Sequence, residues 1–270
     1  MVNLFGKGFI GSRYAEMYNC VVNERNDLNP KLENILYMIS TTDNYNICIN
    51  PYIDIDTNLT TLMRVLENCK NKNITFNFIS SWFVYGDSPL PCREDSPCNP
   101  KGFYSITKRT AELLLIEYCE EHKINYRILR LANVLGPNDS NASPKKNVLT
   151  YIANRLQNNL DVELYDCGDF YRDYVHVDDV CRAIHLVAHT GDINTIYNIG
   201  NNNAIKFKDA VNYLVTQTKS KSIIINIEAN VSDMSLDCSK LFDLGYQPNH
   251  TIDTMLDSLI WASNPLTVNP

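Results

Sequence analysis

The sequence contains no pair of cysteines at C-x-x-C spacing, no block of basic residues and no apolar run long enough to span a bilayer. Its nine cysteines are scattered, so a zinc site is not expected, and we predict no metal. The net charge is −7. This charge argues against nucleic acid and an anionic membrane as partners, and leaves open a local basic site for a phosphorylated small molecule.

The sequence also lacks a basic leader before its first strand-like run, which begins at Val2, and this predicts no signal peptide. An odd number of cysteines in a chain of 270 residues is typical of reduced thiols in a reducing compartment. Internal repeats and low-complexity segments are missing. With 44% apolar and 20% charged residues, the composition is that of a soluble globular protein, and we expect a cytoplasmic one.

A glycine-rich turn stands near the start of the chain. A short apolar run, residues 2–5, leads into Gly6-Lys-Gly8-Phe-Ile-Gly11 and then into a helical stretch to about residue 19. Strand, turn and helix form the context in which G-x-G-x-x-G indicates dinucleotide binding. Gly6 allows the tight turn, Gly8 lets the backbone approach a pyrophosphate, and Gly11 lets helix and strand pack closely. The helix N-terminus then faces the phosphates with its unpaired N–H groups.

The choice between NAD and NADP stays open in the sequence. A short strand over residues 20–25 ends in Glu24 and Arg25. An acidic residue at this position binds the ribose hydroxyls of NAD, whereas an arginine suits the extra phosphate of NADP. The two side chains are adjacent, so the sequence does not decide between the cofactors, and either residue also fits a solvated loop.

Strand-like and helical segments alternate along the chain, which predicts an α/β fold with a parallel sheet flanked by helices. The predicted strands cover residues 34–40, 74–79, 126–131, 162–165, 196–199 and 223–227, and the predicted helices cover residues 54–70, 102–122, 148–158, 179–188, 206–218 and 251–262. Only a few residues separate the strands at 20–25 and 34–40. That gap is too short for a crossover helix and another strand.

Tyr104 and Lys108 are four residues apart at the start of the predicted helix 102–122, so they share one face of it. A free phenol has a pKa of about 10 and is a poor base at neutral pH. A nearby ammonium favours the phenolate, which predicts a lowered pKa for Tyr104 and a side chain able to exchange a proton with a sugar or alcohol hydroxyl. Taken alone, Tyr-x-x-x-Lys is common in helices, and most such pairs are ordinary surface contacts.

The order of four separated motifs along the chain favours a functional role for Tyr104 and Lys108 over an ordinary surface contact. The four motifs are the glycine turn, Ser80-Ser-Trp-Phe-Val-Tyr-Gly86, Tyr104-x-x-x-Lys108 and Arg172-Asp-Tyr-Val-His-Val-Asp-Asp179. In this order they resemble the extended short-chain dehydrogenase/reductases. The chain is similar to the branch that acts on nucleotide-diphosphate sugars, the NAD-dependent epimerases, dehydratases and reductases. Residues 129–137, 197–200 and 236–240 also fit, so the resemblance covers nearly the whole chain.

The resemblance implies three catalytic residues. Tyr104 would transfer the proton, Lys108 would lower its pKa and hold the nicotinamide ribose, and Ser81 would hydrogen-bond the reacting oxygen. The chemistry needs all three, because a hydride moves at the sugar carbon while a proton moves at the oxygen. Ser80 is expected to be a structural hydrogen bonder at the end of its strand.

The resemblance also implies contacts to the NAD or NADP cofactor and to the sugar nucleotide. The implied cofactor contacts are Gly6, Gly8, Phe9, Ile10, Gly11, Glu24, Arg25, Thr41, Asn58, Tyr104 and Lys108. The implied substrate contacts are Ser81, Asn133, Arg172 and Asp237, with arginine suited to a diphosphate because its fork matches two oxygens.

Two of these assignments have a structural alternative, and a nearby histidine has a structural interpretation. Arg172 could instead pair with Asp173 or Asp178. Asp237 fits a helix cap as well as a nucleotide contact. His176 lies in a strand-like run, and we expect a structural role for it.

Departures from the family's motifs narrow the expected activity. The glycine turn is one residue shorter than usual, and the region before the strand at 34–40 is compact, as in dTDP-4-dehydrorhamnose reductases. Sugar 4,6-dehydratases carry Asp-Glu where this chain has Trp82 and Phe83, which cannot do acid–base work. Phe83 also stands near the place of the cysteine found in 3,5-epimerising reductases. We therefore expect a C4 epimerase, with a 4-ketosugar reductase as the alternative and a non-catalytic dinucleotide-binding sensor or scaffold as a third reading.

The expected architecture is a Rossmann-like doubly wound parallel sheet with a smaller C-terminal substrate-binding lobe. We expect residues 1–136 plus about 174–200 to form the dinucleotide-binding domain, and residues of about 137–173 plus 201–263 to form the lobe. The ligand should lie at the carboxyl ends of the strands, between the two. The resemblance implies a UDP-sugar as the substrate and a homodimer that pairs the helices near 56–70 and 102–122.

Overall fold

The computed structural model describes residues 1–42, 46–137, 139 and 147–261. Six strands form the main sheet: β1 Val2–Phe5, β2 Cys20–Val22, β3 Asn34–Tyr37, β4 Thr75–Ser81, β5 Asn125–Leu131 and β9 Thr195–Ile199. Their order is β2-β1-β3-β4-β5-β9, and every neighbouring pair is parallel. All carboxyl ends therefore lie at one edge of the sheet, as the alternating pattern predicts.

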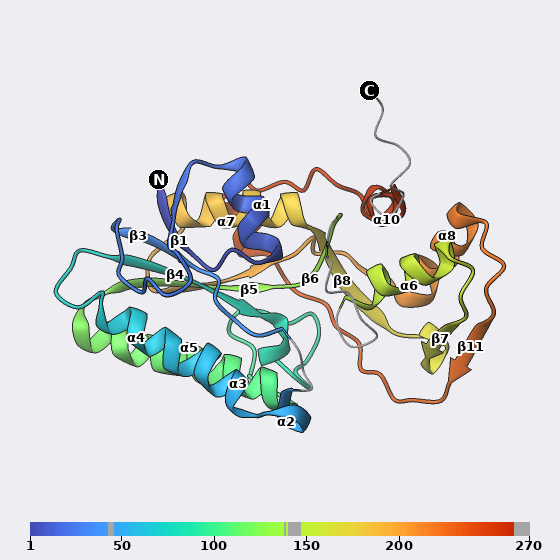
Figure 1. Ribbon diagram of the computed structural model, residues 1–270, viewed down its shortest axis with the longest axis horizontal. Helices are drawn as coiled ribbons and strands as arrows, with labels where there is room; N and C mark the ends of the chain where they lie inside the picture. Colours follow the sequence, from blue (N-terminus) through green and yellow to red (C-terminus); the bar gives the residue numbers. More distant parts are fainter. Residues whose placement is uncertain (43–45, 138, 140–146, 262–270) are drawn as a thin grey trace.

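Helices cover both faces of the main sheet, which confirms the doubly wound architecture (Figure 1). Helices α1 Phe9–Met17 and α7 Val177–Thr190 lie on one face, and α4 Thr61–Glu67 and α5 Phe103–His122 lie on the other. Each face buries its own apolar core, because central parallel strands are covered on both sides.

The predicted helix over residues 54–70 is not one regular helix. It is preceded by α2 Asn46–Ile49 and divided into α3 Tyr52–Asp54, the π-helical segment η1 Ile55–Thr60 and α4. A π-helical turn inserts an extra residue into a helix and is frequently found at functional sites. Here it contains Asn58, which is 2% exposed and turned toward the end of β3.

The first half of the sheet is short, as the sequence predicts, because an 11-residue loop joins β2 directly to β3. Asn3 on β1 donates to the Asn23 side chain at 2.6 Å and accepts from the Lys31 backbone amide at 2.6 Å. Asn23 in turn donates to the main-chain oxygens of Asp27 and Asn29, both at 2.8 Å. Two buried asparagines thus hold the loop where a helix and a further strand stand in a full dinucleotide fold.

The other elements form a second lobe around a third apolar core (Figure 1). Its strands are β6 Asn133–Leu135, β8 Tyr171–His176 and β10 Ala204–Lys206 in one sheet, and β7 Val162–Tyr165 with β11 Ile224–Ile227 in another. Its longer helices are α6 Val148–Gln157, α8 Phe207–Thr218 and α10 Ile252–Trp261. Of the short helical segments, η3 Asp166–Gly168 lies in this lobe, whereas η2 Trp82–Val84 and α9 Ser239–Asp243 pack against the core of the main sheet. Strands β6 and β10 and helix α9 are not predicted by the sequence pattern.

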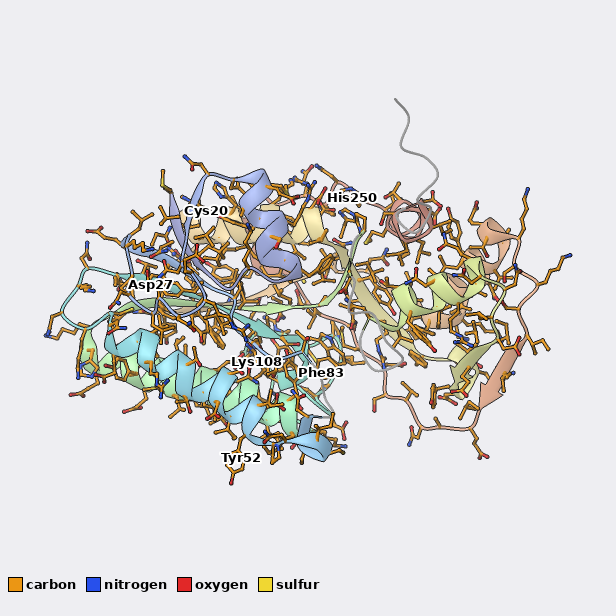
Figure 2. The ribbon with its side chains drawn as sticks, in the orientation of Figure 1. Cys20, Asp27, Tyr52, Phe83, Lys108 and His250 are labelled. Atoms are coloured by element: carbon orange, nitrogen blue, oxygen red, sulfur yellow. The ribbon has the colours of Figure 1, made fainter. Side chains whose placement is uncertain are left out.

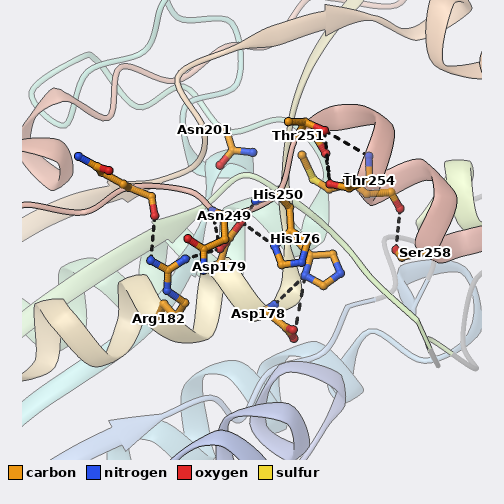
Figure 3. A network of polar contacts seen from close by, with 12 residues as sticks. His176, Asp178, Asp179, Arg182, Asn201, Asn249, His250, Thr251, Thr254 and Ser258 are labelled. Atoms are coloured by element: carbon orange, nitrogen blue, oxygen red, sulfur yellow. Dashed lines mark hydrogen bonds and ion pairs between the residues drawn. The ribbon is translucent and has the colours of Figure 1, made fainter.

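A buried carboxylate joins helix α7 to the chain that returns to α10 (Figure 3). Asp179 is fully buried and accepts from the backbone amides of Asn249 and His250 at 2.9–3.1 Å. It also accepts from Arg182 at 2.8 Å and contacts the His250 ring at 3.0 Å. This network attaches the second lobe to the first turn of α7. Within the described ranges, no helix is both long enough and apolar enough to cross a membrane.

Candidate active site

The glycine turn has the geometry that the motif predicts. Gly6 has φ +98°, a conformation that favours glycine, and a side chain at Gly11 would place its Cβ 2.1 Å from the Gly6 carbonyl oxygen. Apart from its chain neighbours, no described residue has an atom within 4 Å of a Cβ built at Gly8, so the backbone there is open to a ligand. Helix α1 begins without a side-chain cap or an acidic residue in its first turn. Its N-terminal amides therefore suit a phosphate.

The hydroxyls of Ser81 and Tyr104 come together from different elements. Ser81 is the last residue of β4, and Tyr104 lies in the first turn of α5. Burial raises the pKa of Tyr104 to about 12, while hydrogen bonds to Ser81 and Ser40 act in the opposite direction. Two serine hydroxyls thus approach one tyrosine at the carboxyl end of the sheet. Ser40 is a residue that the sequence analysis missed, because nothing in its local pattern shows that the end of β3 meets α5.

Lys108 lies on the α5 side of the sheet, close to Phe83 in the view of Figure 2. Its Nζ donates to the main-chain oxygen of Ile79 at 2.7 Å and lies 4.2 Å from the centre of the Phe78 ring. Burial lowers the pKa of Lys108 to about 7, with Glu112 acting in the opposite direction. The predicted lowering of the Tyr104 pKa by Lys108 is therefore wrong for the chain by itself. Burial has the largest effect on both pKa values, and the Lys108 ammonium hydrogen-bonds to strand β4.

Asn58 connects the ends of three elements around Tyr104. Its Oδ1 accepts from the Thr41 amide at 2.9 Å and from the Ser40 hydroxyl at 3.1 Å. Its Nδ2 donates to the hydroxyls of Thr41 and Thr107 at 2.9 and 3.0 Å, and Thr107 donates to the Tyr104 carbonyl at 2.8 Å. Asn58 and Thr41 therefore hold β3, η1 and the start of α5 together, and in this structure their side chains bind protein groups.

Ser80 has the structural role that the sequence analysis expects. Its hydroxyl donates to Glu112 Oε1 at 2.6 Å, and both residues are buried. Glu112 also accepts two hydrogen bonds from Arg130, at 2.8 and 3.0 Å, and one from Arg109 at 2.8 Å. This network lies one helical turn beyond Lys108, and it fixes α5 against β4 and β5. The sequence pattern did not indicate it.

Arg172 and Asn133 both lie next to Trp82, at the edge of the second lobe. Asn133 donates to the Asp173 carbonyl at 3.0 Å and accepts from the Trp82 ring N–H at 3.3 Å. Arg172 donates to the main-chain oxygens of Tyr171 and Ser232, and its guanidinium lies 4.5 Å from the Phe170 ring centre.

The suggested pairing of Arg172 with Asp173 or Asp178 is not found. Among the described residues, no carboxylate lies within ion-pair distance of Arg172. Asp178 binds Arg13 on α1 through both oxygens, at 2.6 and 2.9 Å. Asp173 is buried, and burial raises its pKa to about 6. Burial also lowers the pKa of Arg172, so this cation is suited to an anionic ligand.

The remaining predicted residues have simpler surroundings. Asp237 lies one residue before Cys238, the N-cap of α9, and accepts from the Ser239 amide at 2.9 Å, so it binds the first amide of the helix without being its cap residue. Glu24 and Arg25 are both exposed, so the structure, like the sequence, does not decide between NAD and NADP. Phe9 and Ile10 form the first turn of α1 and pack against the core of that face.

His176, Asp178 and His250 offer ligand atoms within 4.8 Å of one another (Figure 3). The three groups already have protein partners. The His176 ring accepts from the Asp178 amide at 3.2 Å, Asp178 binds Arg13, and His250 contacts Asp179. The two imidazoles are stacked with their centres 3.8 Å apart. We therefore assign the cluster a structural role at the first turn of α7, as the sequence analysis expects for His176.

A doubly wound sheet with a glycine turn and a Ser-Tyr-Lys group at its carboxyl edge defines an extended short-chain dehydrogenase/reductase. The family model described as the NAD dependent epimerase/dehydratase family matches residues 38–200. The chain belongs to this family.

Curated relatives in this family carry out different reactions. A dTDP-glucose 4,6-dehydratase from Streptomyces antibioticus is 30% identical over 190 residues, which is 66% of this chain and 55% of that protein. A dTDP-4-dehydro-6-deoxyglucose reductase from Escherichia coli is 25% identical over 66% of this chain and 57% of that protein. The matched region thus spans little more than half the length of each relative.

Solved structures share the fold over nearly the whole chain. The UDP-glucose 4-epimerase of Thermotoga maritima, solved with UDP-glucose, has a TM-score of 0.87 and 23% identity, covering 97% of both chains. The protein RMD of Pseudomonas aeruginosa, solved with NADPH, has a TM-score of 0.86 and 20% identity, covering 97% of this chain and 98% of its own. At these identities the likeness establishes the fold.

Proposed function

We propose that the chain is an NAD(P)-dependent C4 epimerase of a nucleotide-diphosphate sugar, and that a UDP-sugar is its substrate. The observation that supports this most directly is that Ser81 and Tyr104 come together at the carboxyl edge of the sheet, on the same side as the open glycine turn, with Lys108 one helical turn after Tyr104 on α5. A proton-transfer group, an oxygen-binding hydroxyl and a dinucleotide cradle are the parts that hydride transfer at a hydroxyl-bearing carbon needs.

The glycine turn and the N-terminus of α1 fit the pyrophosphate of NAD or NADP. Gly8 leaves room for it, and the first amides of α1 are free of side-chain caps. NAD or NADP held there would supply the hydride acceptor and donor for the sugar carbon. In this structure the Lys108 ammonium donates a hydrogen bond to the Ile79 carbonyl. With the cofactor present it would turn to the ribose hydroxyls, whose oxygens would accept its hydrogen bonds and offset the free-energy cost of burying the charge.

Tyr104 would move the proton at the reacting hydroxyl. As a phenolate, Tyr104 would accept this proton as the C–O bond becomes a carbonyl, and as a phenol it would return the proton when the hydroxyl forms again on the other face. Because burial alone raises the pKa of Tyr104 to about 12, the phenolate needs the Lys108 ammonium turned toward the site. Ser81 would donate a hydrogen bond to the same oxygen. The diphosphate would bind at Arg172, a half-buried cation that makes no ion pair within the described chain, with Asn133 beside it. The sugar nucleotide would therefore bridge the main sheet and the second lobe.

A 4,6-dehydratase is a poorer fit, although a dehydratase is among the relatives. Elimination of water needs a further acid and base beside the sugar. The two residues that follow Ser81 are Trp82 and Phe83, whose rings are stacked on each other. Neither ring carries an ionisable group.

A 4-ketosugar reductase is the second candidate, and one feature of the fold favours it. A loop held by Asn3 and Asn23 joins β2 directly to β3, in the place of a helix and a further strand. Less protein is then available to enclose the adenosine end of the cofactor. A reductase needs its cofactor to leave after each turnover, whereas an epimerase keeps its NAD.

The dinucleotide content of the purified protein tests this proposal. We expect about one NAD per chain to be released on denaturation, and interconversion of C4 epimers when UDP-sugars are added. A chain that is empty as purified but binds NADPH and reduces a 4-keto sugar nucleotide would replace the epimerase by the reductase. A chain that binds neither dinucleotide would contradict both.

We also propose a homodimer formed through the outer face of α4 and α5. Ile106 and Leu113 are seven residues apart on one face of α5, and their exposed fractions are 48% and 52%. Sedimentation equilibrium should give twice the chain mass of 30.9 kDa, and Leu113→Glu should give a single chain. Leu160→Glu, in the second lobe and 48% exposed, should stay dimeric as the control. A wild-type protein at single-chain mass would contradict the proposal.

A further inference from the structure

An aromatic surface begins directly beside Tyr104. Trp82 and Phe83 follow Ser81 in the short helical segment η2. Their rings are stacked with centres 4.1 Å apart and planes at 24°. The Phe83 ring stands edge-on to the Tyr104 ring, with centres 5.9 Å apart and planes at 86°. Both side chains are half-buried, so they present ring surface next to the proposed acid–base group.

The same surface ends at Arg172. The guanidinium lies 5.9 Å from the centre of the Trp82 ring and 4.5 Å from that of Phe170. In the proposed function the diphosphate binds at Arg172 and the reacting hydroxyl lies at Tyr104. The sugar ring connects these two groups, so it has to pass along Trp82 and Phe83.

The two rings offer the sugar no unpaired hydrogen-bonding group. The Trp82 ring N–H donates to Asn133 at 3.3 Å, and the Phe83 ring has no polar atom. The Phe83 backbone amide points at the Ser81 hydroxyl, 3.4 Å away. The faces of aromatic rings are negative, so C–H groups pack on them favourably and carboxylates do not. A hydroxyl held there without a partner would lose its hydrogen bonds to water.

We propose that Trp82 and Phe83 select a sugar nucleotide that carries a methyl group at C5, a 6-deoxyhexose, over one that carries a hydroxymethyl or carboxylate group. This inference rests on the proposed reaction at C4. Of the two ring neighbours of C4, C3 bears a hydroxyl and C5 bears the exocyclic carbon. The exocyclic carbon is the only substituent that can be apolar, and it lies next to the reacting centre, as Phe83 lies next to Tyr104.

The experiment compares UDP-6-deoxyglucose with UDP-glucose, which differ only at C6, and adds UDP-glucuronate. Affinities are measured by calorimetry on the cofactor-loaded chain, and kcat/KM is measured for C4 interconversion. We expect the 6-deoxy compound to be preferred over UDP-glucose by about 10- to 100-fold, the range in which an apolar pocket discriminates against an added hydroxyl. Discrimination against UDP-glucuronate should be larger, because a carboxylate loses more hydration.

Phe83→Thr should reduce the preference between UDP-6-deoxyglucose and UDP-glucose to a few-fold, since it opens space and supplies a hydroxyl. The matched control is Phe242→Thr on α9. Phe242 stands edge-on to Tyr246, with ring centres 5.6 Å apart and planes at 83°, nearly the geometry of Phe83 on Tyr104. This variant should keep the wild-type preference. If Phe83→Thr fails to fold, the wild-type ratio still decides the inference.

Two results would overturn the inference, and they are distinguishable. Equal affinity and equal kcat/KM for UDP-6-deoxyglucose and UDP-glucose would overturn the selection by Trp82 and Phe83 and leave the hydride-transfer function standing. A chain that holds its cofactor but turns over neither nucleotide would overturn the proposed function, and the inference with it.

Discussion

Replacing Tyr104 by phenylalanine should lower kcat for C4 interconversion by about 10²- to 10⁴-fold, the range that a positioned proton-transfer group contributes. The substitution removes one hydroxyl and keeps the ring, which is 9% exposed and packed edge-on against Phe83. Binding of the dinucleotide, measured by calorimetry, should therefore change little. The loss of turnover with cofactor still bound would place Tyr104 in the chemical step.

The control for Tyr104→Phe is Tyr37→Phe on β3. Tyr37 is fully buried, and its hydroxyl has no hydrogen-bond partner among the residues that the structure describes, so removing that oxygen should leave both folding and turnover unchanged. If Tyr104→Phe keeps wild-type kcat, another group carries the proton and the proposed role is wrong. If wild type itself turns over no sugar nucleotide, the reading as a sensor or scaffold gains support.

Replacing Glu112 by leucine should lower the free energy of unfolding by about 3–5 kcal/mol, the cost of leaving one member of a buried ion pair without its partner. Arg130 is 1% exposed, and it donates two hydrogen bonds to the Glu112 carboxylate. Ser80 would lose its acceptor as well. The double variant Glu112→Leu with Arg130→Met should recover part of the loss, because no buried charge then remains unpaired. Urea unfolding at pH 7 gives the free energy of unfolding of wild type, Glu112→Leu and the double variant.

Arg109→Ala serves as the control for Glu112→Leu, because it removes the third partner of the same carboxylate. The Arg109 side chain is 26% exposed, so its loss should cost only about 1 kcal/mol or less. A Glu112→Leu variant that loses no more stability than Arg109→Ala would contradict the assignment of the buried pair.

The stabilisation by Glu112 should also depend on pH. Burial acts to raise the pKa of Glu112, but its hydrogen bonds and its attraction to Arg130 outweigh burial and hold the pKa below the usual value. A carboxylate whose pKa is lower in the folded state contributes stability above its unfolded pKa, which is about 4.3, and loses it as the pH falls through the folded pKa. The stability difference between wild type and Glu112→Leu should therefore be constant near neutral pH and shrink in acid. A difference that persists undiminished at pH 3 would speak against an ionised Glu112.

Short-range patterns predicted much of this fold. Gly6, Gly8 and Gly11 lie within one turn, and Tyr104 and Lys108 lie on one helical face, so a few adjacent residues carry each signal. The shortened first half of the sheet was also predictable, because the count of residues between β2 and β3 leaves no room for another helix and strand. These features depend on spacing along the chain, which the sequence states directly.

The tertiary structure decided which side chains meet across long separations. Ser40 reaches Tyr104 from the end of β3, and Glu112 meets Arg130 across 18 residues. Arg172 lies over Trp82, 90 positions away in the chain. The order of the strands sets such contacts, and the order depends on how the whole sheet packs.

The protonation states also needed the folded protein. The sequence alone placed an ammonium one helical turn from Tyr104 and so predicted a lowered pKa for the phenol. In the fold, burial raises the pKa of Tyr104 to about 12 and lowers that of Lys108 to about 7. The sequence by itself determined which groups share the helix. Only the tertiary structure decided their charge, because desolvation depends on what the rest of the chain places around them.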